Sequence, residues 1–187
     1  MGFVNPVEDN QRRNNISSTF QQLYDTVSFA TTVAANSTAE YFQTAANVPG
    51  KQYVMGSGRN PDTVTMIVSS IGVKAYYNDQ TQATGLDLAV LVNTELTLTR
   101  NAGAPNFRAL VSSLIFPGGA NSGGTTDLPQ FGSGGWNTVL ELPEEQQVVL
   151  QQGDLFTVEI KNGEQLTLSA ATELQVILSG NMLQYTS

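Results

Sequence analysis

The alternation of apolar and polar residues is clearest in the C-terminal part of the chain, from Glu141 to Met182. Successive side chains of a β-strand point to opposite faces of a sheet, so short alternating or apolar segments bounded by turn residues predict strands. Between two of these segments, Asn162-Gly163 predicts a hairpin, because a type I′ turn requires positive φ at both central residues. Four strands are predicted here, at residues 148–150, 155–160, 166–169 and 174–178.

One segment near the N-terminus has the period of a helix instead. Ser18 and Gln21 have the three-residue spacing of a capping box, which marks the start of a helix. The apolar residues that follow the i, i+3, i+4, i+7 spacing of one helical face are Phe20, Leu23, Tyr24 and Val27. We therefore expect an amphipathic helix over residues 18–35, preceded by a polar arm at residues 1–16 that has no structure of its own.

From residue 51 onwards the pattern returns to strands separated by turn residues. The predicted strands in this part are residues 53–55, 64–68, 73–77, 86–99, 107–116 and 136–142. About eight to ten strands with no helices between them indicate an all-β sandwich or barrel rather than βαβ units. Their unequal loops favour a jelly roll over an immunoglobulin-like sandwich. The expected organisation is an arm and helical segment at residues 1–50, followed by a jelly-roll domain at residues 51–187.

Composition argues against several functional classes. Charged residues make up 13% of the chain, about half the usual fraction, and the formal net charge is −8. An acidic chain with scattered basic residues argues against nonspecific nucleic-acid binding, which needs a basic surface. The chain contains no cysteine and no histidine. It therefore lacks the ligands of Cys/His zinc sites and the groups of Ser-His-Asp and Cys-His catalysis.

The long loops offer two candidates for ligand binding. A glycine-rich loop at residues 117–135 contains no lysine, so the Gly-Lys-Ser/Thr signature of a phosphate-binding loop is missing. Loops of this length in compact domains tend to be functional or disordered, and we expect this one to act by contact rather than by catalysis. Calcium takes oxygen ligands from loops, although no EF-hand spacing occurs in the chain. The aspartates in predicted loops are Asp62, Asp79, Asp127 and Asp154.

Paired carboxylates and exposed aromatic rings are the remaining candidates. A glycosidase needs two carboxyl groups about 5–10 Å apart. The pairs considered are Asp87 with Glu95, Glu159 with Glu173, and the adjacent Glu144 and Glu145. Such residues usually lie solvated on an outer face, so we expect no catalytic, cofactor-binding or metal-binding residue and no enzymatic activity. The rings considered for sugar stacking are those of Tyr76, Tyr77 and Trp136.

The order of these segments, with long Gly/Ser/Thr loops and few charges, resembles that of the single jelly-roll capsid proteins of icosahedral viruses, bacteriophages in particular. The resemblance covers the whole chain in layout and composition and includes no diagnostic motif, so no functional residue is carried over. It implies a structural protein of the virion that forms homo-oligomers and contacts other capsid proteins without binding nucleic acid directly. The expected contacts are made by the arm (residues 1–16), the helix (residues 18–35) and the loop (residues 117–135).

A carbohydrate-binding or host-adhesion module on the same fold is the alternative function. It requires an exposed Trp136 or Tyr77 with polar neighbours, because sugars stack on flat rings. It also requires saturable sugar binding by the isolated chain, whereas a capsid subunit forms large homomeric assemblies through repeated interfaces. Oligomeric state and sugar binding therefore distinguish the two functions.

Overall fold

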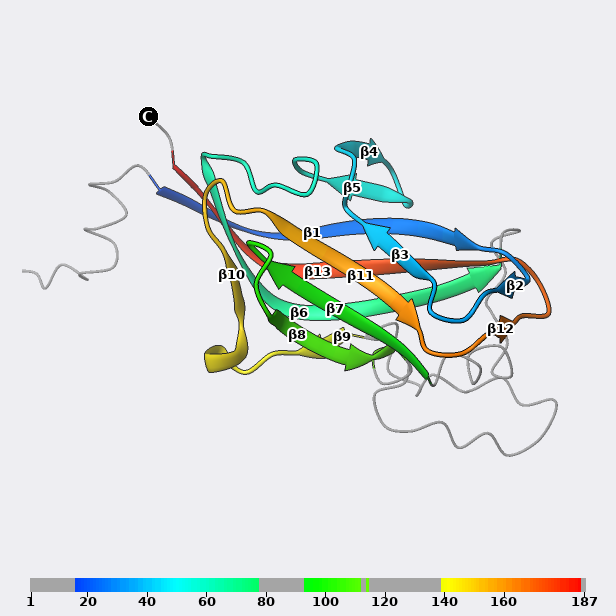
Figure 1. Ribbon diagram of the computed structural model, residues 1–187. Coiled ribbons are helices and arrows are strands. Elements are labelled where there is room, and N and C mark those ends of the chain that lie inside the picture. The colour runs from blue at the N-terminus through cyan, green and yellow to red at the C-terminus, as the bar shows by residue number, and fades with distance from the viewer. Residues whose placement is uncertain (1–15, 78–92, 112–113, 115–138, 186–187) are drawn as a thin grey trace, which may run out of the picture.

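The computed structural model describes residues 16–77, 93–111, 114 and 139–185, which form two large β-sheets packed face to face and one small two-stranded sheet (Figure 1). The strands are β1 (Ile16–Phe29), β2 (Thr32–Val33), β3 (Thr38–Tyr41), β4 (Ala46–Val48), β5 (Gln52–Val54), β6 (Val64–Tyr77), β7 (Thr94–Arg100), β8 (Pro105–Leu110), β9 (Val139–Glu141), β10 (Val148–Leu150), β11 (Phe156–Asn162), β12 (Leu166–Thr167) and β13 (Thr172–Tyr185). A short 3-10 helix, η2 (Glu144–Gln146), lies between β9 and β10.

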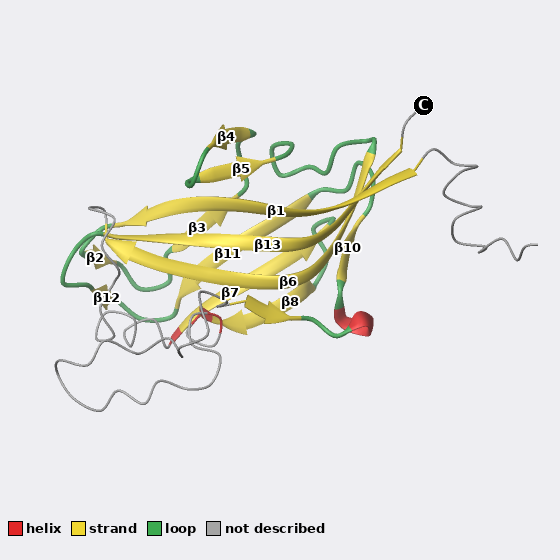
Figure 2. Cartoon of the chain, turned by 180° about the vertical axis from the view of Figure 1, so that it is seen from behind, coloured by secondary structure: helices red, strands yellow, loops and turns green. Residues whose placement is uncertain are grey.

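The described strands pair antiparallel in the order of a jelly roll. The seven-stranded sheet has the order β10-β6-β13-β1-β5-β4, with β9 also paired to β6, and it is nearest the viewer in Figure 2. The four-stranded sheet has the order β3-β11-β7-β8. The chain passes repeatedly between the sheets, so that β1 from its beginning pairs with β13 from its end. This interleaving is that of two Greek keys, and the predicted all-β jelly-roll fold is confirmed.

The hydrophobic core lies between the two sheets and is built from alternate residues of the long strands. In β11, Phe156, Val158 and Ile160 are buried, while Thr157 and Glu159 between them are partly exposed. The inward residues of β6, β7 and β13 meet them in one cluster. Each fully buried aliphatic side chain contributes about 1.5–3 kcal/mol relative to an exposed one, which is why the alternation fixes the inward face of each strand.

The helix predicted at residues 18–35 is wrong. Residues 18–29 belong to β1, whose fourteen residues pair with β13 along their whole length, and residues 32–33 form β2. Leu23 and Phe29 are buried toward the core, and Asp25 occupies an inward position between them. The Asp25 carboxylate tolerates burial because it accepts hydrogen bonds from the Phe42 amide at 2.6 Å and the Gln52 side chain at 2.7 Å. Because Asp25 interrupts the apolar residues on the inward side of β1, the two-residue period of a strand is not visible in the sequence. The apolar residues of the segment match the spacing of a helix instead.

Strands on both sides of residue 50 belong to the same seven-stranded sheet. β1 and β4 precede this position, and β5 and β6 follow it. β4 and β5 pair with each other across it, and the Lys51 amide donates to the Val48 carbonyl at 3.0 Å in the turn. Residues 16–50 are therefore an integral part of the sandwich. Residues 1–15, which contain nearly all of the expected arm, lie outside the described residues.

The Asn162-Gly163 pair does not form the predicted hairpin. β11 ends at Asn162, and β12 pairs with β2 instead of returning along β11. Neither residue has positive φ, which a type I′ turn would require. The Asn162 side chain is 2% exposed and donates to the carbonyls of Ala34 and Glu164, both at 2.7 Å. Hydrogen bonds to a distant segment, rather than the local turn preference, therefore set the conformation at this position.

The other strand predictions differ mainly in their ends. Residues 148–150 coincide with β10, whereas the two strands expected at residues 64–68 and 73–77 form one continuous strand, β6. Of the strand expected at residues 107–116, residues 107–110 belong to β8, whereas Val111 and Leu114 are helical and residues 112–113 and 115–116 lie outside the described residues. Residues 86–92, the glycine-rich loop at residues 117–135 and Trp136 lie outside the described residues.

Candidate functional surfaces

A buried ion pair joins the end of β7 to the turn after β10. Arg100 Nε pairs with Asp154 Oδ2, and the Asp154 carboxylate also accepts from Asn101 Nδ2 at 2.8 Å and from the Gln151 amide at 2.6 Å. Burial by itself would raise the pKa of Asp154. The hydrogen bonds from Asn101, Arg100 and Gln151, with the positive charge of Arg100, outweigh burial and lower that pKa below the ordinary 3.8. The carboxylate therefore holds two loops together as an anion.

The aspartates considered as calcium ligands are already paired where the structure describes them. Asp154 is bonded to Arg100, and Asp62 lies 2.8 Å from Arg59 Nη2. A calcium ion would have to displace these arginines to use the carboxylates. Asp79 and Asp127 lie outside the described residues. In the part of the chain that the structure describes, no group of three or more His, Cys, Asp or Glu side chains could hold a metal ion.

The carboxylate pairs do not come together in the described structure. Glu159 lies on β11 of the four-stranded sheet. Glu173 lies on β13 of the other sheet, where its Oε1 is 3.3 Å from Lys51 Nζ. Glu144 and Glu145 are exposed on η2. None of these arrangements places two carboxylates across a shared cavity, as glycoside hydrolysis would require.

The aromatic residues considered for sugar stacking give no described platform. Tyr77 packs against the hydrophobic core, and its hydroxyl lies 3.2 Å from Ser169 Oγ. Trp136 and the side chain of Tyr76 lie outside the described residues, as does Asp87, the carboxylate considered with Glu95. Of the three rings considered for sugar stacking, the structure therefore describes only that of Tyr77, which is partly covered by the core.

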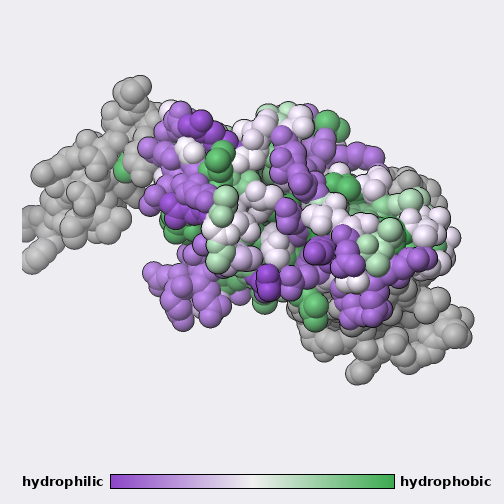
Figure 3. All heavy atoms as spheres, viewed as in Figure 1, coloured by the Kyte–Doolittle hydropathy of each residue, from purple (hydrophilic) through white to green (hydrophobic). Residues whose placement is uncertain are grey.

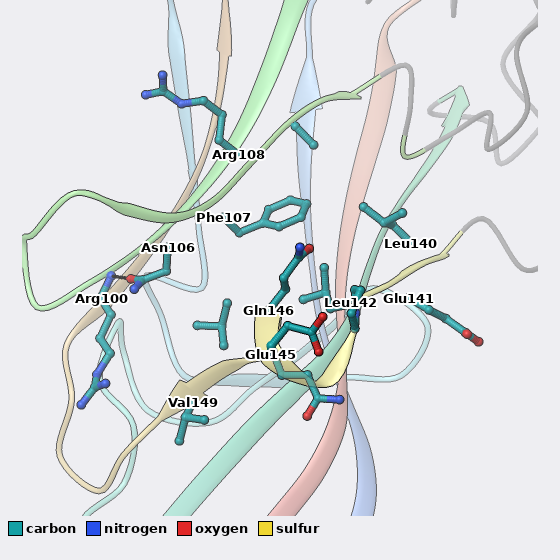
Figure 4. A pocket seen from close by; sticks show the side chains of 14 residues that line it. Arg100, Asn106, Phe107, Arg108, Leu140, Glu141, Leu142, Glu145, Gln146 and Val149 are labelled. Carbon is teal, nitrogen blue, oxygen red and sulfur yellow. Dashed lines mark hydrogen bonds between the residues drawn. The ribbon is translucent and has the colours of Figure 1, made fainter.

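An open groove lies at the edge of the sandwich between β8 and the segment that runs from β9 through η2 to β10. Its volume is about 980 Å³. Figure 4 shows Phe107 of β8 across from Leu142 and Gln146, with Arg100 and Arg108 on the β8 side. The described lining residues include two carboxylates, Glu141 and Glu145, beside Arg100 and Arg108, and no Ser, Thr, Cys, His or Lys. The charged side chains around an aromatic ring make the groove suitable for binding a polar ligand.

The outer face of the four-stranded sheet is charged. Its outward positions on β3, β7, β8 and β11 carry Glu40, Glu95, Arg108, Glu159 and Lys161. Arg108 Nε lies 3.3 Å from Glu95 Oε1. Figure 3 is viewed from this side and shows hydrophilic side chains spread over much of it, with apolar residues in small separate patches. This face has the character of an ordinary solvated surface.

One end of the opposite outer face, on the seven-stranded sheet, carries no charge. We define the uncharged face as the outer side of residues 16–24 of β1, 64–72 of β6, 148–150 of β10 and 177–185 of β13. These segments contain no Asp, Glu, Lys or Arg. Phe20 lies in this face with 65% of its surface exposed. A large exposed apolar side chain within an uncharged region is typical of a surface that contacts a partner.

The lack of charged residues in these segments is visible in the sequence, but the hydrophobic pattern alone does not show that they form one face. Each contributing segment is a run without charge, yet the runs lie far apart along the chain. Only the pairing of β1 with β13, and of β13 and β10 with β6, brings them together. Phe20 was assigned to the apolar side of a helix, whereas the strand turns it outward.

No protein-family model matches the chain, and no curated protein or solved structure matches it either. Among the described residues, no helix has the length and apolar character needed to cross a membrane. Function is therefore inferred from the strand order and the surfaces of the chain itself.

Proposed function

We propose that the chain is a structural subunit of a virus capsid and that it self-assembles in the shell of the virion. The observation that carries the proposal is a jelly-roll strand order in a chain that exposes an uncharged sheet face. The fold alone does not decide function, because lectin domains and cupins share it. The surface favours assembly, since a shell subunit must bury large areas against its neighbours.

The composition fits this role. Charged groups are costly to remove from water, so surfaces that become buried on assembly are depleted in them. Only 13% of the residues are charged, and Phe20 and Leu155 expose 65% and 57% of their surfaces. Single exposed apolar residues are common in monomers. Phe20 carries more weight than Leu155 because it lies within the uncharged face.

The sheet edges also favour contacts between copies. In the described part of the chain, β10 and β4 lie at the ends of the seven-stranded sheet order, and β3 and β8 at the ends of the four-stranded one. Edge strands present backbone groups to which a further strand can be added. The arm at residues 1–16 and the loop at residues 117–135 remain the segments we propose to reach neighbouring copies and other capsid proteins. We propose that the first half of β1 makes the contact expected of the helix. The net charge of −8 argues against direct contact with nucleic acid.

The alternative, a carbohydrate-binding or host-adhesion module, is favoured by one observation. The groove between β8 and η2 has a volume of about 980 Å³ and contains the ring of Phe107 beside arginine and glutamate side chains. A sugar could stack on this ring and bond to the charged groups. The alternative requires a single ring to supply the stacking, whereas assembly draws on a whole sheet face.

Size-exclusion chromatography with light scattering, followed by electron microscopy of the full chain, tests the proposal. We expect the mass to rise with protein concentration and regular assemblies to form as salt and pH are varied. A monomer that persists at the highest concentration under all conditions contradicts capsid assembly. Saturable binding to a glycan array by such a monomer, lost on Phe107→Ala, would establish the alternative.

A further inference from the structure

Four strands place one row of side chains across the uncharged face. The pairing registers align Phe20 of β1 with Asn181 of β13, Asn181 with Ile67 of β6, and Ile67 with Val149 of β10. Val149 is 37% exposed, whereas its neighbours in β10 are buried. Side chains aligned across antiparallel strands lie on the same face. The row therefore reads Phe, Asn, Ile and Val from one side of the sheet to the other.

Charge marks this face as the one through which two copies can meet. The outer face of the four-stranded sheet carries three glutamates, one arginine and one lysine. Two copies with a net charge of −8 repel each other, and burying those side chains would add a desolvation cost. Contact through the uncharged face avoids this desolvation cost and brings no charged side chains of the face opposite each other. Charged residues border the face at Glu141, opposite Ser70, and at Arg100 and Glu145, which line the groove together with Val149. This is the charge pattern of an interface core with a polar rim.

We infer that the uncharged face binds the same face of a second copy, about a two-fold axis that runs parallel to the strands. This inference rests on the proposed function and names the surface through which assembly occurs. Such an axis reverses the strand order across the interface, so that β1 of one copy lies over β10 of the other. The row then matches itself, because Phe20 packs on the partner's Val149 and Asn181 lies across from the partner's Ile67.

The area of the face is sufficient for a weak specific contact. Strands lie about 4.8 Å apart and rise about 3.3 Å per residue, so this part of the sheet covers roughly 500 Å². Two copies therefore bury about 1,000 Å², which is near the lower limit for a specific interface. A weak contact suits a shell, where many copies of one interface act together.

The chain leaves the sheet where it can add to this contact. The start of β1 and the end of β13 lie at the same end of the sandwich (Figure 1), where Ile16 pairs with Tyr185. Fifteen residues precede Ile16, and an extended chain of that length spans up to about 50 Å. The axis places this end of β1 over the partner's β10 edge. In this arrangement each chain therefore enters β1 beside its partner.

Charge substitutions in the full chain test the interface. We expect Phe20→Glu and Val149→Glu to remain monomeric at concentrations where the wild type associates, as measured by sedimentation velocity. Leu155→Glu is the matched control, because it adds the same charge at a residue with 57% exposure outside the face, and we expect it to associate like the wild type. Circular dichroism and the midpoint of thermal unfolding establish that each variant is folded. Association of Phe20→Glu at wild-type concentrations overturns the inference.

A charge exchange tests the axis itself. In the double variant Phe20→Glu with Val149→Lys, each new carboxylate faces a new ammonium group on the partner, so we expect association to return and to weaken as salt is raised. Within one copy the two positions are three strands apart, about 14 Å, and cannot pair directly. The double variant Phe20→Glu with Val149→Glu should stay monomeric. Failure of the first double variant to associate more than the second refutes the two-fold arrangement.

The outcomes separate this inference from the proposed function. If the wild type assembles and Phe20→Glu assembles equally well, the capsid role stands and the interface is wrong. If the wild type is a monomer under all conditions, both are wrong. A lipid membrane is the other partner that an uncharged face could bind, and flotation with phosphatidylcholine vesicles tests it. A monomeric wild type that binds these vesicles and loses binding on Phe20→Glu, but not on Leu155→Glu, shows that the face meets lipid and overturns the inference.

Discussion

Replacing Asp154 with asparagine removes a buried negative charge while keeping the size of the side chain. The Asp154 carboxylate accepts from Asn101 Nδ2 at 2.8 Å and from the Gln151 amide at 2.6 Å, and it pairs with Arg100 Nε. The Gln151 amide and Arg100 Nε both contact Oδ2, so an asparagine whose oxygen takes that position keeps both neighbours. Its amino group must then face a donor at the other position, and the charge of Arg100 loses its partner.

The expected loss of stability follows from the burial of this pair. Removing one partner of a buried ion pair costs about 3–5 kcal/mol. The Asp154 side chain is 10% exposed but that of Arg100 is 28% exposed, so we expect a value near the lower end, about 3 kcal/mol. For a chain of this size, such a loss lowers the midpoint of thermal unfolding by about 6–12 °C.

The chain supplies its own control for this measurement. Asp62 pairs with Arg59 at 2.8 Å, but these side chains are 75% and 56% exposed. Exposed pairs contribute about 0–1 kcal/mol, so Asp62→Asn should change stability little. Urea unfolding followed by circular dichroism at pH 7 measures both variants, and urea leaves the ion pairs unscreened. If Asp154→Asn is no less stable than Asp62→Asn, the structural role assigned to the buried pair is wrong.

The same pair predicts the direction of a pH effect. Because the fold lowers the pKa of Asp154, its stabilisation is present above the ordinary carboxyl value of 3.8 and is lost as the pH falls from there through the lowered pKa. About one pH unit or more above the unfolded pKa, the carboxyl group is ionised in both the folded and the unfolded chain. The difference in unfolding free energy between the wild type and Asp154→Asn should therefore be constant from about pH 5 to pH 7 and shrink at lower pH. A difference that does not change down to pH 2 would contradict the assigned charge state.

Two further substitutions test close packing at Gly180 and buried hydrogen bonds at Asn60. Gly180→Ala should destabilise the fold by about 1–3 kcal/mol or more, because its Cβ would lie 1.8 Å from the backbone carbonyl oxygen of Ile67, whereas Gly163→Ala meets nothing closer than 3.4 Å and should be tolerated. Thermal unfolding of the two variants measures the difference, and equal midpoints would contradict the packing at the β6–β13 bulge. Asn60→Ala should cost about 1–3 kcal/mol in urea unfolding, because its amide donates to three backbone carbonyls at 2.6–2.9 Å, while the exposed Asn47→Ala serves as a neutral control. An Asn60→Ala variant as stable as Asn47→Ala would show that these bonds contribute nothing.

The sequence predicted best where local alternation and burial agree. β10 coincides with its predicted residues, β11 covers all but the first residue of the strand expected at residues 155–160, and β13 contains the strand expected at residues 174–178. In these strands the inward positions are apolar, so the period of two is visible without knowledge of the partner strand. At Asn162-Gly163 a strong turn signal failed, since side-chain hydrogen bonds to Ala34 and Glu164 outweigh the local preference.

By itself, the sequence determined the all-β class and most strands of the C-terminal part, because alternation is a local property of the chain. It also determined the low charge and the lack of histidine and cysteine, which restrict the possible chemistry. Only the tertiary structure decided that the segment of Phe20 is a strand, because its pairing partners in β13 lie more than 140 residues away. The uncharged face exists for the same reason, since strands from distant parts of the chain form it only when they pair. Such surfaces depend on pairing register, which no single stretch of sequence encodes.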